Sequence, residues 1–239
     1  MITAVLCDLD DTLYPQSAWL AGAWNAVATR AAEAYDVSRY ELLAVLNGVA
    51  AEGSDRGRII DRALAAVGRR DVPIVPLLDA FRRHAPAELT MYSGVREALA
   101  ELRSCVRIAV VTDGEPAIQR AKVQALGLEV DAVVYSDELG RDRRKPHPLP
   151  FYHALAAVGA RGTDAVFVGD RPGKDIAGAA GVGMRAVRVL TGEYAHAPDD
   201  PPAWRVVANA ADAFRMLHDQ AVSEALVSVT STFALSPRR

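Results

Sequence analysis

Cysteine is scarce in this chain of 239 residues, which contains only Cys7 and Cys105. Both lie in or beside apolar stretches that we expect to form buried strands, where cysteine behaves as a small hydrophobic residue. The sequence leaves a disulfide between them open, but two cysteines give no sign of the disulfide framework of a small secreted protein.

Long apolar runs and a strong excess of one charge are also missing. No uninterrupted apolar run reaches the length of a membrane span, and residues 221–235 are broken by Glu224 and several serines and threonines. No basic region followed by an apolar signal segment precedes the first apolar stretch. The net charge is −3 and the pI is about 6, so neither nucleic acid nor an anionic membrane is an expected partner. We expect a cytoplasmic monomer or homodimer.

The pattern of apolar residues predicts two kinds of architecture in one chain. Residues 15–87 read as four helices with short connections and no strand, which indicates a helical bundle. Residues 1–14 and 88–220 read as apolar strands alternating with helices, which is typical of a parallel sheet covered on both faces. The predicted fold is therefore α/β, a doubly wound, Rossmann-like parallel sheet with an inserted helical bundle. Residues 221–239 lack a firm pattern and are expected to be a tail, disordered or facing a dimer partner.

The predicted strands and helices follow in a regular order. Strands are expected at residues 4–7, 106–111, 132–135, 165–168, 184–189 and 206–207, and helices of the α/β part at 95–102, 116–126, 148–158, around 177–180 and up to about 218. In the bundle, Trp19 and Trp24 could form a platform for a substrate. Their helical spacing makes a place in the bundle core the better interpretation.

Acidic residues follow the first strand directly. An ionised carboxylate such as Asp8 is costly to bury without a partner, so a positive charge is expected beside it. A divalent cation is the simplest candidate, because Asp8 and Asp10 offer the oxygen ligands that Mg2+ prefers. The alternative is a strand followed by an aspartate-rich turn without function.

Further polar residues fall where later strands end. Thr112 and Asp170 follow two strands, Lys145 lies in a loop before a helix, and Asp175 comes five residues after Asp170. Taken singly, such a threonine is usually a cap and such a lysine a surface residue. Open α/β sheets bind ligands at the carboxyl ends of their strands, so together these residues predict one site.

The order and spacing of these residues resemble the haloacid dehalogenase-like hydrolase superfamily. Its motifs read here as Asp8-Leu9-Asp10-Asp11-Thr12, Thr112, Lys145-Pro146 and Gly169-Asp170 with Asp175. The resemblance spans residues 3 to about 190, and the helical insertion looks like the first cap type of that family. It implies a Mg2+-dependent phosphatase that hydrolyses a small phosphorylated metabolite through an aspartyl-phosphate intermediate.

The resemblance also assigns roles to the acidic residues. Asp8 is expected to attack phosphorus, and as a carboxylate it needs no base to do so at neutral pH. Asp10 is expected to act as general acid and base, which favours phosphate esters over dehalogenation. The metal would be held by Asp8, the backbone carbonyl of Asp10 and Asp170, with Asp175 in support.

The remaining motif positions are expected to bind the phosphoryl group. Thr112 would donate its hydroxyl and Lys145 would balance the negative charge. Backbone N–H groups of Asp113 and Gly114 could cradle the phosphate. Asp113 and Arg171 depart from the family's common Asn and Ser, and their extra charges put the affinity for substrate in doubt.

Selection of the substrate is expected to depend on the insertion. Its glycine-flanked break carries Arg56 and Arg58, which could bind an anionic group far from the scissile phosphate. The alternative is that both are solvated or cap a helix.

Three other functions compete with the phosphatase. A receiver domain of two-component signalling also combines acidic residues with a Thr and a Lys. It lacks a helical insertion and the later Gly-Asp motif that this chain has. A phosphomutase of the same family and a binding or regulatory protein with a vestigial site remain as alternatives.

Overall fold

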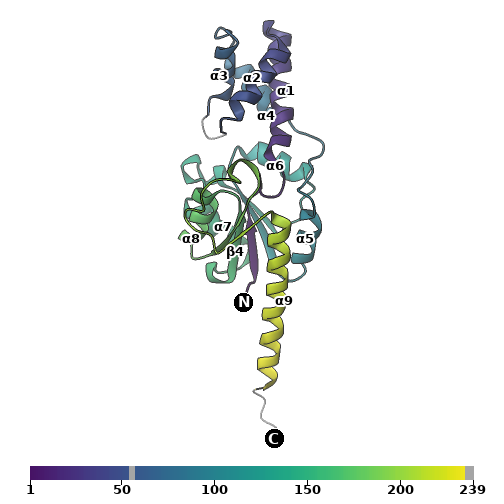
Figure 1. Cartoon of the computed structure of the whole chain (residues 1–239), viewed down its shortest axis with the longest axis vertical. Coiled ribbons are helices and arrows are strands. Elements are labelled where there is room, and N and C mark those ends of the chain that lie inside the picture. The colour runs from purple at the N-terminus through teal and green to yellow at the C-terminus, as the bar shows by residue number, and fades with distance from the viewer. Residues whose placement is uncertain (54–56, 235–239) are drawn as a thin grey trace. The chain divides into compact units, whose positions relative to one another are not determined.

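The computed structural model describes residues 1–53 and 57–234, with the side chains of 1–53 and 57–227 (Figure 1). It divides into two compact units: Met1–Pro15, Thr90–Gln119 and Leu128–Arg239 form an α/β unit, and Gln16–Leu89 with Arg120–Gly127 form a helical unit. The helices are α1 (Gln16–Tyr35), α2 (Arg39–Ala50), α3 (Ile59–Ala66), α4 (Ile74–Arg83), α5 (Val95–Leu102), α6 (Pro116–Ala125), α7 (Pro148–Val158), α8 (Ala177–Gly181) and α9 (Ala210–Ala234). The strands are β1 (Ala4–Cys7), β2 (Arg107–Thr112), β3 (Ala132–Tyr135), β4 (Ala165–Gly169), β5 (Arg185–Val189) and β6 (Arg205–Val207).

The six strands form one parallel sheet in the order β3-β2-β1-β4-β5-β6. This is the order of a doubly wound sheet, so the predicted α/β fold is confirmed. The direction of winding changes between β1 and β4, which are hydrogen-bonded neighbours. Ligands of such sheets bind at that point, outside the carboxyl ends of the strands.

Burial explains why these strands are apolar throughout. All four residues of β1 and all five of β4 are buried, because helices cover both faces of the sheet. In Figure 1, α7 and α8 lie to one side of β4, and α5 and α9 lie to the other. On the first side, Leu6 and Phe167 pack with Phe151 of α7 and Ala179 of α8. The rings of Phe151 and Phe167 have their centroids 5.1 Å apart.

The helical unit has a separate core. The four helices predicted between residues 15 and 87 are confirmed, and Leu42, Leu46 and Leu77 are fully buried among them. Trp19 and Trp24 are buried as well, as expected for core residues. The segment 120–127, outside the predicted boundaries of the bundle, groups with these helices, so α6 contributes to both units.

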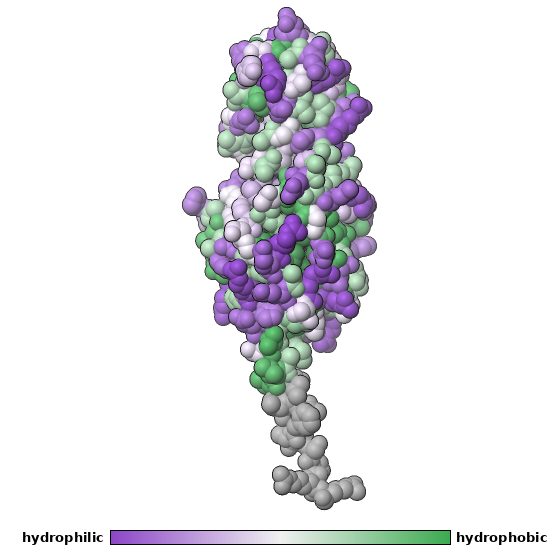
Figure 2. All heavy atoms as spheres, turned by 90° about the vertical axis from the view of Figure 1, so that its right-hand side faces the viewer, coloured by the Kyte–Doolittle hydropathy of each residue, from purple (hydrophilic) through white to green (hydrophobic). Residues whose placement is uncertain are grey.

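The C-terminal helix is longer than predicted. The expected end near residue 218 is wrong, because α9 continues to Ala234. Glu224 explains part of the extension, since its carboxylate accepts a hydrogen bond from Ile2 N at 2.7 Å and fixes this turn beside the start of β1. Beyond it Leu226 and Val227 are exposed, and Figure 2 shows hydrophobic surface at this end of α9. Within the described residues, no helix is both long and apolar enough to cross a membrane.

Two glycines of α8 provide a test of how tightly α8 packs on α7. A Cβ on Gly178 would come within 2.4 Å of the Phe151 ring and 3.2 Å of Pro146 Cα, whereas one on Gly181 would meet nothing within 4 Å. We expect Gly178→Ala to lower the free energy of unfolding by about 1–3 kcal/mol through overpacking. Gly181→Ala should leave it unchanged or raise it by up to about 1 kcal/mol. Urea denaturation measures both, and equal effects would contradict this packing.

Candidate active site

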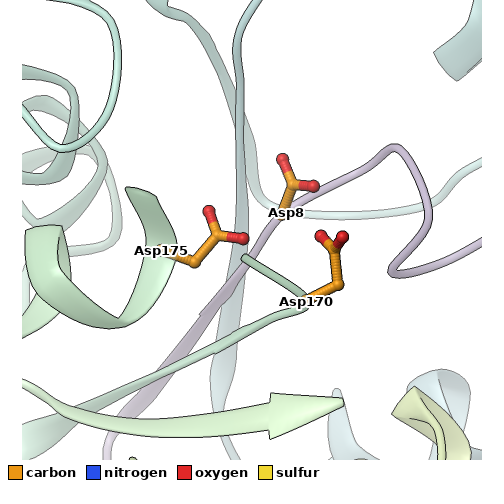
Figure 3. A group of neighbouring side chains, drawn as sticks. All are labelled: Asp8, Asp170 and Asp175. Carbon is orange, nitrogen blue, oxygen red and sulfur yellow. The ribbon is translucent and has the colours of Figure 1, made fainter. Parts of the chain in front are cut away.

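Three buried carboxylates meet beside the point where the sheet changes direction. Asp8 directly follows β1, Asp170 directly follows β4, and Asp175 lies in the short π-helix η5 (Pro172–Ile176). Each can present an oxygen within 4.8 Å of the others. Figure 3 shows the three side chains grouped together. Their exposed fractions are 5%, 1% and 0%. The structure thus brings together three of the four predicted metal ligands.

Local contacts hold these carboxylates in place. Asp175 accepts a hydrogen bond from Arg171 N at 3.0 Å, and it lies where a Cβ on Gly169 would be, 2.5 Å from Oδ2. Glycine at position 169 is therefore required for this close approach. The buried hydroxyl of Thr12 donates to Asp170 Oδ1 at 3.3 Å. Thr12 ends the first motif and thus orients Asp170, which belongs to the Gly169-Asp170 motif.

Lys145 provides a positive charge within this group. Its Nζ lies 2.5 Å from Asp8 Oδ1 and 2.8 Å from Asp175 Oδ1, and the side chain is 3% exposed. Burial alone would lower the pKa of Lys145, but the carboxylates of Asp175 and Asp8 outweigh it and raise that pKa. The carboxylates therefore favour the charged form of this lysine.

A single lysine does not balance three carboxylates. Burial, followed by the negative charge of Asp175, raises the pKa of Asp170, to about 9. Burial also raises the pKa of Asp8, to about 7; Lys145 counteracts this and Asp175 adds to it. Crowded oxygen ligands whose ionised forms are disfavoured are what a hard divalent cation stabilises, so the residues fit Mg2+.

Asp10 lies outside this group of three carboxylates and has hydrogen-bond donors of its own. Tyr14 donates its hydroxyl to Asp10 Oδ1 at 2.5 Å, and Gln119 of α6 donates from Nε2 to Asp10 Oδ2 at 2.8 Å. The same Nε2 lies 2.5 Å from Thr112 Oγ1. The structure therefore connects the predicted Asp10 and Thr112 through Gln119, a residue that the sequence analysis did not single out.

Asp113 and Arg171, the two residues that depart from the family pattern, both have interaction partners in the structure. Asp113 Oδ1 accepts a hydrogen bond from Lys145 N at 3.1 Å, and Oδ2 lies 3.8 Å from Lys174 Nζ. The guanidinium of Arg171 stacks on Tyr194, 4.2 Å from the ring centroid, and donates to its hydroxyl at 2.7 Å. Asp113 thus fixes the backbone of Lys145 instead of adding an unbalanced charge.

The other predicted binding groups have the following positions. Gly114 N donates to Asp137 Oδ1 at 3.4 Å, so this N–H already has an acceptor. Arg58 directly precedes α3, and its guanidinium lies 3.3 Å from Asp61 at the surface of the helical unit. That contact matches the solvated alternative, and a role in reading substrate stays a prediction. Arg56 lies outside the described residues.

Comparison with known proteins gives one consistent family. The model of the haloacid dehalogenase-like hydrolases matches residues 2–183. A glyceraldehyde 3-phosphate phosphatase of Methanopyrus kandleri is 36% identical over 203 residues, covering 81% of this chain and 86% of the relative. A ribulose-1,5-bisphosphate 5-phosphatase of Halopiger xanaduensis is 35% identical over 204 residues, covering 78% and 84%. Among solved structures, the magnesium-bound HAD hydrolase YfnB of Bacillus subtilis matches with a TM-score of 0.66 at 16% identity, over 90% of this chain and 98% of its own, which shows the fold alone.

The crowding of carboxylates predicts an unusual response to Asp170→Asn. Without metal, this variant should be about 1–4 kcal/mol more stable than the wild type at neutral pH, because the wild type must bind a proton at Asp170 in order to fold and an asparagine need not. The folded-state pKa of Asp170 is raised, so its contribution to stability is present at low pH and lost as the pH rises from about 4 to about 9. The difference between the two proteins should therefore widen over that range, as urea denaturation in EDTA can measure.

Bound Mg2+ should reverse the order of stability of the wild type and Asp170→Asn. It should raise the melting temperature of the wild type and have a smaller effect on Asp170→Asn. Asp219→Asn, at an exposed position of α9, serves as the control and should behave as the wild type. Identical pH dependence and identical Mg2+ response of Asp170→Asn and wild type would contradict the predicted charge balance.

Proposed function

Because this chain belongs to the haloacid dehalogenase-like hydrolases, we propose that it is a Mg2+-dependent phosphatase that releases phosphate from a small phosphomonoester. The observation that carries the proposal is the pair of separate acidic environments after β1. Asp8 is buried against Lys145 and two further carboxylates, whereas Asp10 is bound to Tyr14 and Gln119. Two carboxylates in different environments suit two different roles.

The first chemical step uses Asp8 as nucleophile. A carboxylate oxygen of Asp8 forms a bond to phosphorus while the bond from phosphorus to the ester oxygen breaks, which leaves an aspartyl-phosphate. The leaving oxygen takes a proton from Asp10, so that it departs as an alcohol. Mg2+ held by Asp8, Asp170, Asp175 and the backbone carbonyl of Asp10 would reduce the repulsion between the nucleophile and the phosphoryl oxygens.

The second step returns the enzyme to its starting state. Asp10, now a carboxylate, accepts a proton from water as that water attacks phosphorus, and the bond to Asp8 breaks to release inorganic phosphate. Lys145 stays beside Asp8 throughout and balances the negative charge that moves between nucleophile and phosphate. Thr112 donates its hydroxyl to a phosphoryl oxygen.

The substrate class follows from the relatives. Two of them are named for glyceraldehyde 3-phosphate and for ribulose 1,5-bisphosphate, both small phosphorylated carbohydrates. We expect a metabolite of this size and polarity for this chain. Residues 15–87 follow the first motif as an insertion, and we propose that they act as the cap that selects the substrate.

Removal of metal tests the proposed activity. The protein should hydrolyse p-nitrophenyl phosphate, lose this activity in EDTA and regain it with excess Mg2+. Phosphate release without a sugar-bisphosphate activator would exclude a phosphomutase. Activity undiminished after thorough chelation would contradict the metal assignment, and no release from a broad panel of phosphorylated metabolites would favour a vestigial site.

Substitution of the two carboxylates tests their roles. Asp8→Asn should abolish turnover, because an amide cannot replace the nucleophile. Asp10→Asn should slow turnover by ~10²–10⁴-fold, the typical contribution of a general acid and base. Asp219→Asn again serves as the control for a lost surface charge. Near-normal turnover of a folded Asp8→Asn protein would show that the covalent mechanism is wrong.

A further inference from the structure

The amide side chain of Gln119 lies between two groups of the proposed mechanism. It lies on α6, is 1% exposed, and its Nε2 is 2.8 Å from Asp10 Oδ2 and 2.5 Å from Thr112 Oγ1. The NH2 group of Gln119, and not its carbonyl, faces Asp10 and donates to Oδ2. The backbone makes room for this side chain: a Cβ on Gly114 would lie 3.3 Å from Gln119 Cδ, and Gly114 has a φ of +127°.

The two hydrogens of one amide group can satisfy both contacts. One hydrogen is donated to Asp10, whose other oxygen accepts from the Tyr14 hydroxyl, so the plane of the carboxylate is fixed from two sides. The other hydrogen is donated to Thr112 Oγ1, which then acts as acceptor. The hydroxyl hydrogen of Thr112 is thereby left to be donated elsewhere, as a phosphoryl oxygen requires.

We propose that Gln119 is a positioning residue that sets the orientation of Asp10 and the direction of the Thr112 hydroxyl at the same time. The proposal rests on the phosphatase mechanism above, in which Asp10 protonates the leaving group and Thr112 binds the phosphoryl group. In this role Gln119 forms and breaks no bond itself. Its effect is on the geometry of the two residues that do.

The dependence on the leaving group tests this role. A p-nitrophenolate leaves without help from an acid, whereas an alkoxide needs a proton from Asp10. Gln119→Met keeps the length and removes both donors. We expect it to lower kcat/KM for glycerol phosphate by about 10–100-fold, as expected for a misplaced catalytic group, and to lower kcat/KM for p-nitrophenyl phosphate much less. It should also weaken inhibition by inorganic phosphate, since Thr112 is no longer directed.

Control variants separate positioning from general damage. Gln124→Met, at an exposed position of the same helix, should leave both substrates unaffected. In the Asp10→Asn background, Gln119→Met should add little to the loss on glycerol phosphate, because both changes remove the same function. Gln119→Glu has the same shape but no NH2 group, and it places a carboxylate against Asp10. It should also lose more activity on glycerol phosphate than on p-nitrophenyl phosphate. This variant replaces Gln119→Met if Gln119→Met does not fold.

The outcomes distinguish this inference from the proposed function. Equal losses on both substrates, full additivity with Asp10→Asn, or no loss on glycerol phosphate would overturn the role of Gln119. If Asp10→Asn itself retained full activity on both substrates, the mechanism would fail, and with it the reason for positioning Asp10.

Discussion

The balance of buried charge at the carboxyl ends of β1 and β4 is the constraint on which the site depends. Three carboxylates and one ammonium group are almost fully withdrawn from water there. Removing one partner of a buried ion pair typically costs about 3–5 kcal/mol, so such a group persists only when its geometry is well supported. Lys145 supplies part of the compensation within the chain, and in the proposed function a bound cation supplies the rest.

Much of the surrounding structure can be understood as support for this balance. Asp113 holds the backbone of Lys145, Thr12 orients Asp170, and the missing side chain of Gly169 lets Asp175 approach. These contacts join segments that are far apart in sequence but adjacent at the point where the sheet changes direction. Asp10 lies outside the group of three carboxylates, and Tyr14 and Gln119 donate hydrogen bonds to it. The proposed nucleophile, Asp8, and the proposed acid/base group, Asp10, can thus lie two positions apart in sequence and still differ chemically.

The sequence allowed the fold and the acidic site to be predicted because both leave local signals. Strands buried on both faces read as apolar runs, and a carboxylate such as Asp8 or Asp170 directly after such a run requires a partner. Gln119 left no such signal, because a glutamine in a helix is ordinary and its contacts with Asp10 and Thr112 arise only from the tertiary fold. The extension of α9 was missed for the same reason: Glu224 is held by Ile2, more than two hundred positions away in sequence.

The role of Asp113 also depends on a contact that only the tertiary fold creates. From sequence it looked like an unfavourable charge beside a phosphate, since the partner of its carboxylate could not be read from the motif. In the structure this carboxylate accepts the N–H of Lys145. Departures from a family pattern can therefore be interpreted only when the contacts of the new side chain are known.

The central claim is that Asp8 carries the phosphoryl group during turnover, and trapping that species tests it most directly. Asp10→Asn should retain phosphoryl transfer from p-nitrophenyl phosphate, whose leaving group needs no acid, but should be slow in hydrolysis of the intermediate. Acid quenching of this variant during turnover, followed by mass spectrometry of its peptides, should find one phosphoryl group on Asp8 that hydroxylamine removes. Release of p-nitrophenol without any phosphorylated peptide, or with the phosphoryl group on another residue, would contradict the account.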